Sequence, residues 1–136
     1  MNIRTAGMED YAFLSENDRH IRPEELRRVL SQGRVLLLRQ GGERAGWLRW
    51  GLFWDNTPFM NLLYVLEEYR GQGCGRRLAA CWEERMREDG FDLVMTSTRS
   101  DEEAQHFYRG LGYTDCGALL LPGEPLELIF RKEIRL

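Results

Sequence analysis

The sequence predicts one α+β domain with a mixed, mostly antiparallel central sheet flanked by helices. The chain has 136 residues, of which 43% are hydrophobic, and this is enough for a single buried core. Residues 59–97 read as strand, helix and strand, an order typical of two parallel strands joined by a crossover. Residues 34–53 and 113–133 each read as two strands joined by a turn. We therefore expect one domain over residues 1–136, with a sheet that is antiparallel except near its centre.

The first part of the chain predicts a short strand and two helices. Residues 3–5 are expected to form the strand, and residues 8–17 carry apolar side chains at helical spacing. Pro23 suits the first turn of a second helix, because a helix does not use the N–H group at that position. Gly33 suits the C-terminal cap of the same helix.

The middle of the chain predicts three strands. Residues 34–40 are a short apolar run, residues 41–44 favour a turn, and residues 45–53 form the second strand of a hairpin. Residues 54–58 have the composition of a loop. The strand over 59–66 follows this loop.

The C-terminal half predicts two more helices among the remaining strands. The expected elements are a helix over 74–89, a strand over 92–97, a helix from Ala104 to about Gly110, and strands over 113–121 and 126–133. The whole order is β-α-α-β-β-β-α-β-α-β-β.

Composition excludes several classes of protein. The net charge of −3 offers no basic surface for nucleic acid, and no apolar run is long enough to span a bilayer. Residues 1–6 lack the apolar core of a secretory signal. The three cysteines do not have the spacing of metal ligands, so we expect no metal and reduced thiols in a cytoplasmic protein.

A glycine-rich turn between the strand at 59–66 and the helix at 74–89 is the main functional signal. Arg70 is followed by Gly71, Gly73 and Gly75. At such a junction backbone N–H groups and the helix dipole suit a phosphate, and glycine lets the backbone approach the ligand closely. No Lys-Ser/Thr pair follows, and the spacing is not Gly-x-Gly-x-x-Gly, so neither a nucleotide P-loop nor a dinucleotide fingerprint fits.

The pattern Arg-x-x-Gly-x-Gly, placed after Leu63-Tyr64-Val65, resembles the acetyl-CoA-binding motif of the GNAT superfamily of N-acetyltransferases. The segment from Asp101 to Tyr113 is similar to a second motif of that family, Asn-x-x-Ala-x-x-Phe/Leu-Tyr-x-x-x-Gly-Phe. Asp101 stands where the family usually has asparagine, so it lacks the amide donor and adds a negative charge. The predicted order of elements is also that of the GNAT fold.

The resemblance implies acetyl-CoA as cofactor, held beside a splayed pair of parallel strands. The implied cofactor-binding residues are Leu63, Tyr64, Val65, Arg70, Gly71, Gln72, Gly73, Cys74, Gly75, Arg76 and Asp101. It also implies a catalytic role for Tyr108, whose hydroxyl is expected to protonate the departing CoA thiolate. The alternative is that Tyr108 only packs the apolar face of its helix beside Phe107.

The acceptor side is less well defined. Some family members use a glutamate where this chain has Phe59, which cannot take a proton. The expected acceptor-binding residues are His20, Trp54, Asp55 and Asn61, with Asp55, Glu67, Glu68, Glu124 and His20 as weaker candidates for a base. Deprotonation of the amine through ordered water is the default.

We therefore interpret the chain as a cytoplasmic N-acetyltransferase that moves an acetyl group from acetyl-CoA to a primary amine by direct attack in a ternary complex. The amine belongs to a small molecule, a peptide N-terminus or a lysine, and the protein is a monomer or a homodimer. The alternative from another class is a CoA-binding sensor or regulatory module without turnover.

Overall fold

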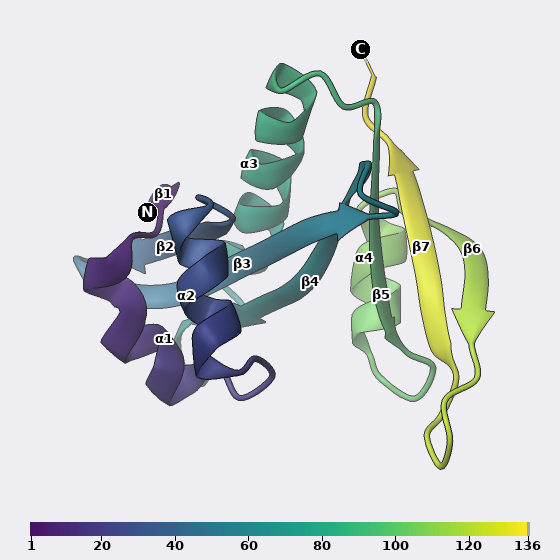
Figure 1. Cartoon of the computed structure of the whole chain (residues 1–136), viewed down its shortest axis with the longest axis horizontal. Helices are drawn as coiled ribbons and strands as arrows, with labels where there is room; N and C mark the ends of the chain where they lie inside the picture. The colour runs from purple at the N-terminus through teal and green to yellow at the C-terminus, as the bar shows by residue number, and fades with distance from the viewer. Residues whose placement is uncertain (136) are drawn as a thin grey trace. The chain divides into compact units, whose positions relative to one another are not determined.

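The computed structural model of the chain describes residues 1–135 and is mixed α+β (Figure 1). The strands are β1 (Asn2–Thr5), β2 (Val35–Gln40), β3 (Glu43–Phe53), β4 (Thr57–Val65), β5 (Leu93–Arg99), β6 (Thr114–Leu119) and β7 (Glu127–Glu133). The helices are α1 (Tyr11–Asn17), α2 (Pro23–Ser31), α3 (Cys74–Glu88) and α4 (Ala104–Gly110), with short 3-10 turns η1 (Met8–Asp10) and η2 (Glu67–Tyr69). The predicted order of strands and α-helices is confirmed, while η2 was not expected.

The strands follow the order β1-β2-β3-β4-β5-β7-β6 in a seven-stranded sheet. The pairs β1–β2, β2–β3, β5–β7 and β6–β7 are antiparallel. The β4–β5 pair is parallel and joins Phe59 to Met95 and Met60 to Thr96. The predicted sheet, antiparallel except near its centre, is thus confirmed. Within residues 1–135 no helix is long and apolar enough to cross a membrane.

The Cα positions group the chain into two compact units. The first comprises residues 1–51 and 62–82, and the second comprises residues 52–61 and 83–135. Both β4 and α3 contribute residues to each unit.

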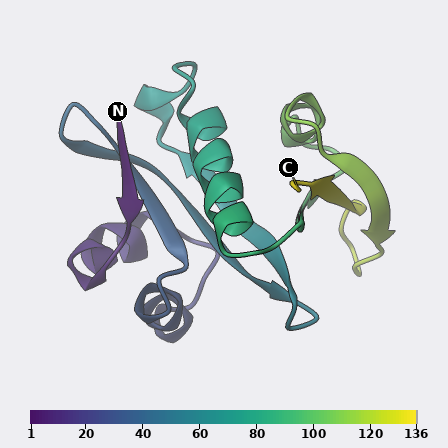
Figure 2. The same ribbon diagram turned by 90° about the horizontal axis from the view of Figure 1, so that it is seen from above.

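In the first unit, α1 and α2 cover one face of β2 and β3. Leu14 of α1 and Leu26 of α2 are buried in a cluster with Leu37 and Trp47 of the two strands. Figure 2 shows these helices on the opposite side of the strands from α3. On the α3 side, a Cβ added at Gly46 would lie 2.9 Å from a β4 backbone oxygen and 3.4 Å from Leu78 of α3. Glycine at this position therefore allows β3, the end of β4 and α3 to pack closely.

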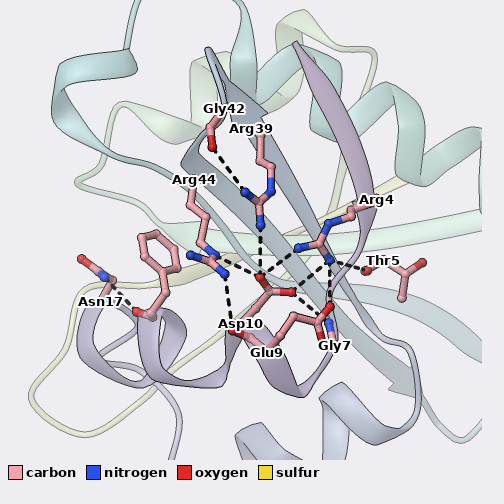
Figure 3. A network of polar contacts seen from close by, with 10 residues as sticks. Arg4, Thr5, Gly7, Glu9, Asp10, Asn17, Arg39, Gly42 and Arg44 are labelled. Atoms are coloured by element: carbon pink, nitrogen blue, oxygen red, sulfur yellow. Dashed lines mark hydrogen bonds and ion pairs between the residues drawn. The ribbon is translucent and has the colours of Figure 1, made fainter.

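A buried carboxylate ties β1, β3 and η1 together (Figure 3). Asp10 is fully buried and accepts two hydrogen bonds of 3.0 Å from Arg4 and one of 2.9 Å from Arg44. The backbone N–H of Gly7 donates a further bond, and Arg39 of β2 lies 3.9 Å away. Burial alone would raise the pKa of Asp10, but these hydrogen bonds together lower it, so the carboxylate stays ionised at neutral pH.

The second unit has its own apolar core. Phe130 of β7 is fully buried, and the ring of Tyr108 on α4 lies 6.2 Å from it. Tyr113 donates a 2.8 Å hydrogen bond to the carboxylate of Glu83, which also pairs with Lys132 at 2.7 Å. These contacts fix α4 and the following chain against β7.

The turn between β3 and β4 is tighter than the loop predicted over 54–58. It is closed by a 3.1 Å hydrogen bond from the N–H of Asn56 to the carbonyl of Phe53, and β4 already begins at Thr57. Trp54 (φ +56°) and Asp55 (φ +63°) both have left-handed backbone angles, as the central residues of a type I′ turn require. Hairpin periodicity does not reveal this, because such turns usually carry Asn-Gly.

Replacing Asp55 with glycine should therefore stabilise the protein, because glycine adopts the left-handed region without the cost that other residues pay there. We expect the free energy of unfolding, measured by urea denaturation, to rise by about 0.5–1 kcal/mol. Asp55→Ala is the control, since it removes the same carboxylate but retains the positive φ. A lower urea midpoint for Asp55→Gly than for Asp55→Ala would contradict this explanation.

Candidate functional site

The end of β4 leads directly into the predicted phosphate-binding turn. The N–H of Leu66 donates a 2.8 Å hydrogen bond to the carbonyl of Ala45 on β3, which holds the strand end in place. The η2 turn follows, and its last bond runs from the N–H of Arg70 to the carbonyl of Glu67 at 3.2 Å. The glycine-rich segment therefore starts from a backbone that is fixed on the side of β4.

The conformation of the turn depends on its glycines. Gly71 has φ +77° and Gly73 has φ +84°, values that other residues rarely adopt. A Cβ added at either position would meet no atom within 4 Å, so both residues face open space. Gly73 and Gly71 thus give the backbone its left-handed turns and leave its surface uncovered for a ligand.

The start of α3 supplies hydrogen-bond donors at the same place. Its first bond runs from the N–H of Arg77 to the carbonyl of Gly73 at 3.0 Å. The N–H groups of Cys74, Gly75 and Arg76 consequently have no acceptor within the helix. The helix has no acidic residue in its first turn, so no side-chain charge there competes with an anion. Such a set of N–H donors suits a pyrophosphate, and the pyrophosphate site at this turn stays a prediction.

Arg70 is held against the end of β4. Its Nε donates a 2.9 Å hydrogen bond to the carbonyl of Val65, and its guanidinium lies 5.3 Å from the centre of the Tyr64 ring. Because the Nε bond uses only one of the five guanidinium N–H groups, both Nη groups are left to donate to a phosphate.

Other predicted cofactor-binding residues have separate positions around the turn. The side-chain carbonyl of Gln72 accepts a 3.2 Å hydrogen bond from Gln40 of β2. Cys74 is buried, which agrees with a small side chain that fills space, whereas Arg76 is exposed. Leu63 on β4 is half-buried. The three cysteines are free thiols, as expected.

Tyr108 lies in the second unit and is only 7% exposed. Its hydroxyl is 3.8 Å from the sulfur of Met60, and it also interacts with Thr96 of β5. Burial raises the pKa of Tyr108 to about 12, so the hydroxyl remains protonated at neutral pH. A general acid must be protonated before it can donate a proton. The same buried surroundings are equally compatible with a tyrosine that only packs the core.

Asp101 does not carry an isolated negative charge. Both of its carboxylate oxygens accept hydrogen bonds from Arg99, at 3.2 Å from Nε and 2.9 Å from Nη2. This bidentate pair offsets the charge that replaces the family's asparagine. Asp101 is thus paired with a neighbouring guanidinium.

The residues predicted for the acceptor side do not form one described cluster. The backbone N–H of His20 bonds to Asp18, and its side chain is exposed. Trp54 is 80% exposed at the β3–β4 turn beside Asp55, and Asn61 is exposed on β4. Hollows of about 360 and 340 Å³ in the second unit are lined by other residues. Within residues 1–135 no group of three metal-ligating side chains converges.

The spacing of apolar residues in the sequence did not reveal the residues that support β3, the glycine-rich turn and the end of β4. Asp18 is buried and accepts hydrogen bonds from Trp47 Nε1 (3.1 Å) and Arg49 Nε (2.7 Å). Gln40 and Gly46 support the turn and the end of β4 in the same unit. An aspartate just after a helix reads as an ordinary exposed residue, so only the fold reveals its partners.

Comparison with known proteins agrees with this geometry. The sequence profile of the Acetyltransferase (GNAT) family matches residues 4–113. This chain therefore belongs to the GNAT acetyltransferase family. No curated protein matches the sequence.

Solved structures with the same fold cover nearly the whole chain. The ribosomal-protein-alanine N-acetyltransferase of Brucella melitensis is 25% identical, with 98% of this chain and 99% of that chain covered and a TM-score of 0.78. PaiA N-acetyltransferase from Thermoplasma acidophilum, solved with coenzyme A, is 17% identical, with 97% and 98% covered and a TM-score of 0.82. YncA from Salmonella typhimurium, solved with acetyl-CoA, is 21% identical, with 100% and 95% covered and a TM-score of 0.81.

Proposed function

We propose that this protein is an N-acetyltransferase that binds acetyl-CoA at the Arg70–Gly75 turn and acetylates a primary amine. The observation that carries the proposal is the turn itself, with left-handed Gly71 and Gly73 and the N–H groups at the start of α3. Membership of the GNAT acetyltransferase family supports it. So do the relatives that were solved with coenzyme A or acetyl-CoA.

Each part of the turn has a defined task in cofactor binding. The backbone N–H groups at the start of α3 and the Nη groups of Arg70 hold the pyrophosphate, while backbone groups of Leu63 to Val65 pair with the pantetheine chain. Gln72 lies within the turn and Arg76 follows it. Asp101, paired with Arg99, contributes no free charge. Bound acetyl-CoA supplies the thioester from which the acetyl group passes directly to the amine in a ternary complex.

The chemistry needs two proton movements besides cofactor binding. The acceptor ammonium loses a proton to ordered water, because Phe59 cannot act as a base. His20, Asn61, Trp54 and Asp55 are the residues we assign to the acceptor. The Tyr108 hydroxyl donates a proton to the sulfur as the carbon–sulfur bond breaks and is reprotonated from solvent.

The acceptor amine belongs to a small molecule, a peptide N-terminus or a lysine. The N-acetyltransferase from Brucella melitensis acts, by its name, on an alanine of a ribosomal protein. Peptides that begin with alanine should therefore be included in the first substrate panel. We propose a cytoplasmic location, which the free cysteines support. We also propose that the protein is a monomer or a homodimer.

Acetyl-CoA should raise the melting temperature of the protein, because a ligand that binds only the folded state stabilises it. At a concentration 100-fold above Kd the gain is about 2.7 kcal/mol, which corresponds to a shift of several degrees. ATP and NAD serve as controls and should shift Tm much less. Equal shifts with all three compounds would refute the cofactor assignment.

Release of free thiol from acetyl-CoA in the presence of an amine panel then tests turnover. We expect release that depends on the amine, with the acetylated product detected by mass spectrometry. Tight binding of acetyl-CoA without any acetylated product, including from a metabolite extract, would instead favour a CoA-binding sensor.

A further inference from the structure

Three side chains in the first unit form a continuous stack that ends at the cofactor turn. The Arg70 guanidinium lies over the Tyr64 ring at 5.3 Å, and the Trp47 ring lies 5.1 Å from the Tyr64 ring between ring centres. Tyr64 is 38% exposed, while Trp47 is fully buried. The stack therefore runs from the protein interior to the surface at which Arg70 stands.

The inner end of the stack is fixed by a buried ion pair. The indole N–H of Trp47 donates a 3.1 Å hydrogen bond to Asp18, whose carboxylate also accepts bonds of 2.7 and 3.3 Å from Arg49. The side chains of Asp18 and Arg49 are 0% and 8% exposed. Phe13 packs edge-on against the same indole at 5.7 Å. Trp47 is thus held on several sides, and it offers the Tyr64 ring a fixed surface.

We propose that Tyr64 is a positioning residue for the cofactor, whose ring holds the Arg70 guanidinium in the orientation that binds phosphate. The proposal rests on the function proposed above and adds a side-chain role to a residue assigned there only through its backbone. Two contacts define the orientation: the ring below the guanidinium and the Val65 carbonyl that accepts from Nε. Together they point to Nη1 and Nη2 as the donors that remain for the ligand.

The advantage of this arrangement is reduced conformational freedom. A free arginine side chain loses rotamer entropy when it binds a phosphate, whereas one already stacked and bonded loses less. A contact between a cation and an aromatic ring at an exposed position has an energy equivalent to about a two- to fivefold change in an equilibrium constant. Loss of the ring should therefore raise Kd by about this factor. Lysine cannot replace arginine here, because it has neither the planar face nor the Nε donor.

A double-mutant cycle on acetyl-CoA affinity tests the proposal by isothermal titration calorimetry. Tyr64→Leu should raise Kd about two- to fivefold in the wild-type protein and leave it unchanged when Arg70 is already alanine. Tyr64→Phe retains the ring and should bind like wild type. Arg70→Lys should lose nearly as much affinity as Arg70→Ala, and this measurement does not depend on whether Tyr64→Leu folds.

The outcomes separate this inference from the proposed function. If wild-type protein does not bind acetyl-CoA, the proposed function fails. If wild type binds but Tyr64→Leu has the same effect with and without Arg70, Tyr64 acts only on the fold and the positioning role is wrong. Wild-type affinity in Arg70→Lys would also overturn it, since charge alone would then suffice.

Discussion

Replacing Gly73 with valine is expected to raise the Kd for acetyl-CoA on the order of 100-fold, the effect of losing two hydrogen bonds to a charged group. The wild-type residue has φ +84° and faces open space, so valine meets no protein atom there. We expect the valine side chain to extend into the space that the phosphate would use to reach the N–H groups at the start of α3. The phosphate can then no longer approach those donors.

Gly42 in the β2–β3 turn offers a closely matched control. It has φ +83° and also faces open space, so Gly42→Val introduces the same backbone strain in the same unit, at a residue outside the Arg70–Gly75 segment. Both variants should lose about 1–2 kcal/mol of stability. Only Gly73→Val should lose acetyl-CoA binding by calorimetry, and equal affinity in the two variants would show that the phosphate binds elsewhere.

Replacing Tyr108 with phenylalanine is expected to lower kcat on the order of 100-fold, the usual effect of losing a general acid. The ring that packs against Phe130 remains, and the lost hydroxyl has only a weak 3.8 Å contact with the Met60 sulfur besides its interaction with Thr96. Melting temperature and acetyl-CoA affinity should therefore change little, because only the transition state uses the proton.

The pH dependence of this effect follows from the raised pKa. Since burial raises the pKa of Tyr108 to about 12, the hydroxyl stays protonated throughout pH 6–10. The ratio of wild-type to Tyr108→Phe kcat should then not fall through titration of Tyr108 anywhere in this range. Tyr113→Phe is the control, because it removes a buried hydroxyl from a ring 5.7 Å away. If Tyr108→Phe has the same kcat as wild type at every pH from 6 to 10, Tyr108 only packs the core and water supplies the proton.

Local chemistry made the fold predictable. The helix that begins at Pro23 could be predicted from the spacing of its apolar residues, and the parallel β4–β5 pair from the order strand, helix, strand. The β3–β4 turn was predicted as a longer loop, because Trp54 is not a residue that usually adopts positive φ.

The candidate site also has one part that could be predicted from the sequence and one part that could not. The turn at Arg70–Gly75 could be located from the sequence, since glycine spacing and the start of a helix are local features. By contrast, the stack of Arg70, Tyr64 and Trp47 depends on the contact between Trp47 of β3 and Tyr64 of β4, which lie on different strands. No sequence period encodes such contacts.

By itself, the sequence determined the α+β fold and the position of the glycine-rich turn at Arg70–Gly75, because hydrophobic spacing and glycine placement act within a few residues. Only the tertiary structure decided that Asp18 lies buried against Trp47 and Arg49. The tertiary structure also decided that Tyr108 is buried, which raises the pKa of its hydroxyl and keeps it protonated well above neutral pH. The physical reason is that burial and charge pairing depend on which distant segments meet, and these determine the energy of an ionisable group more strongly than its neighbours in sequence.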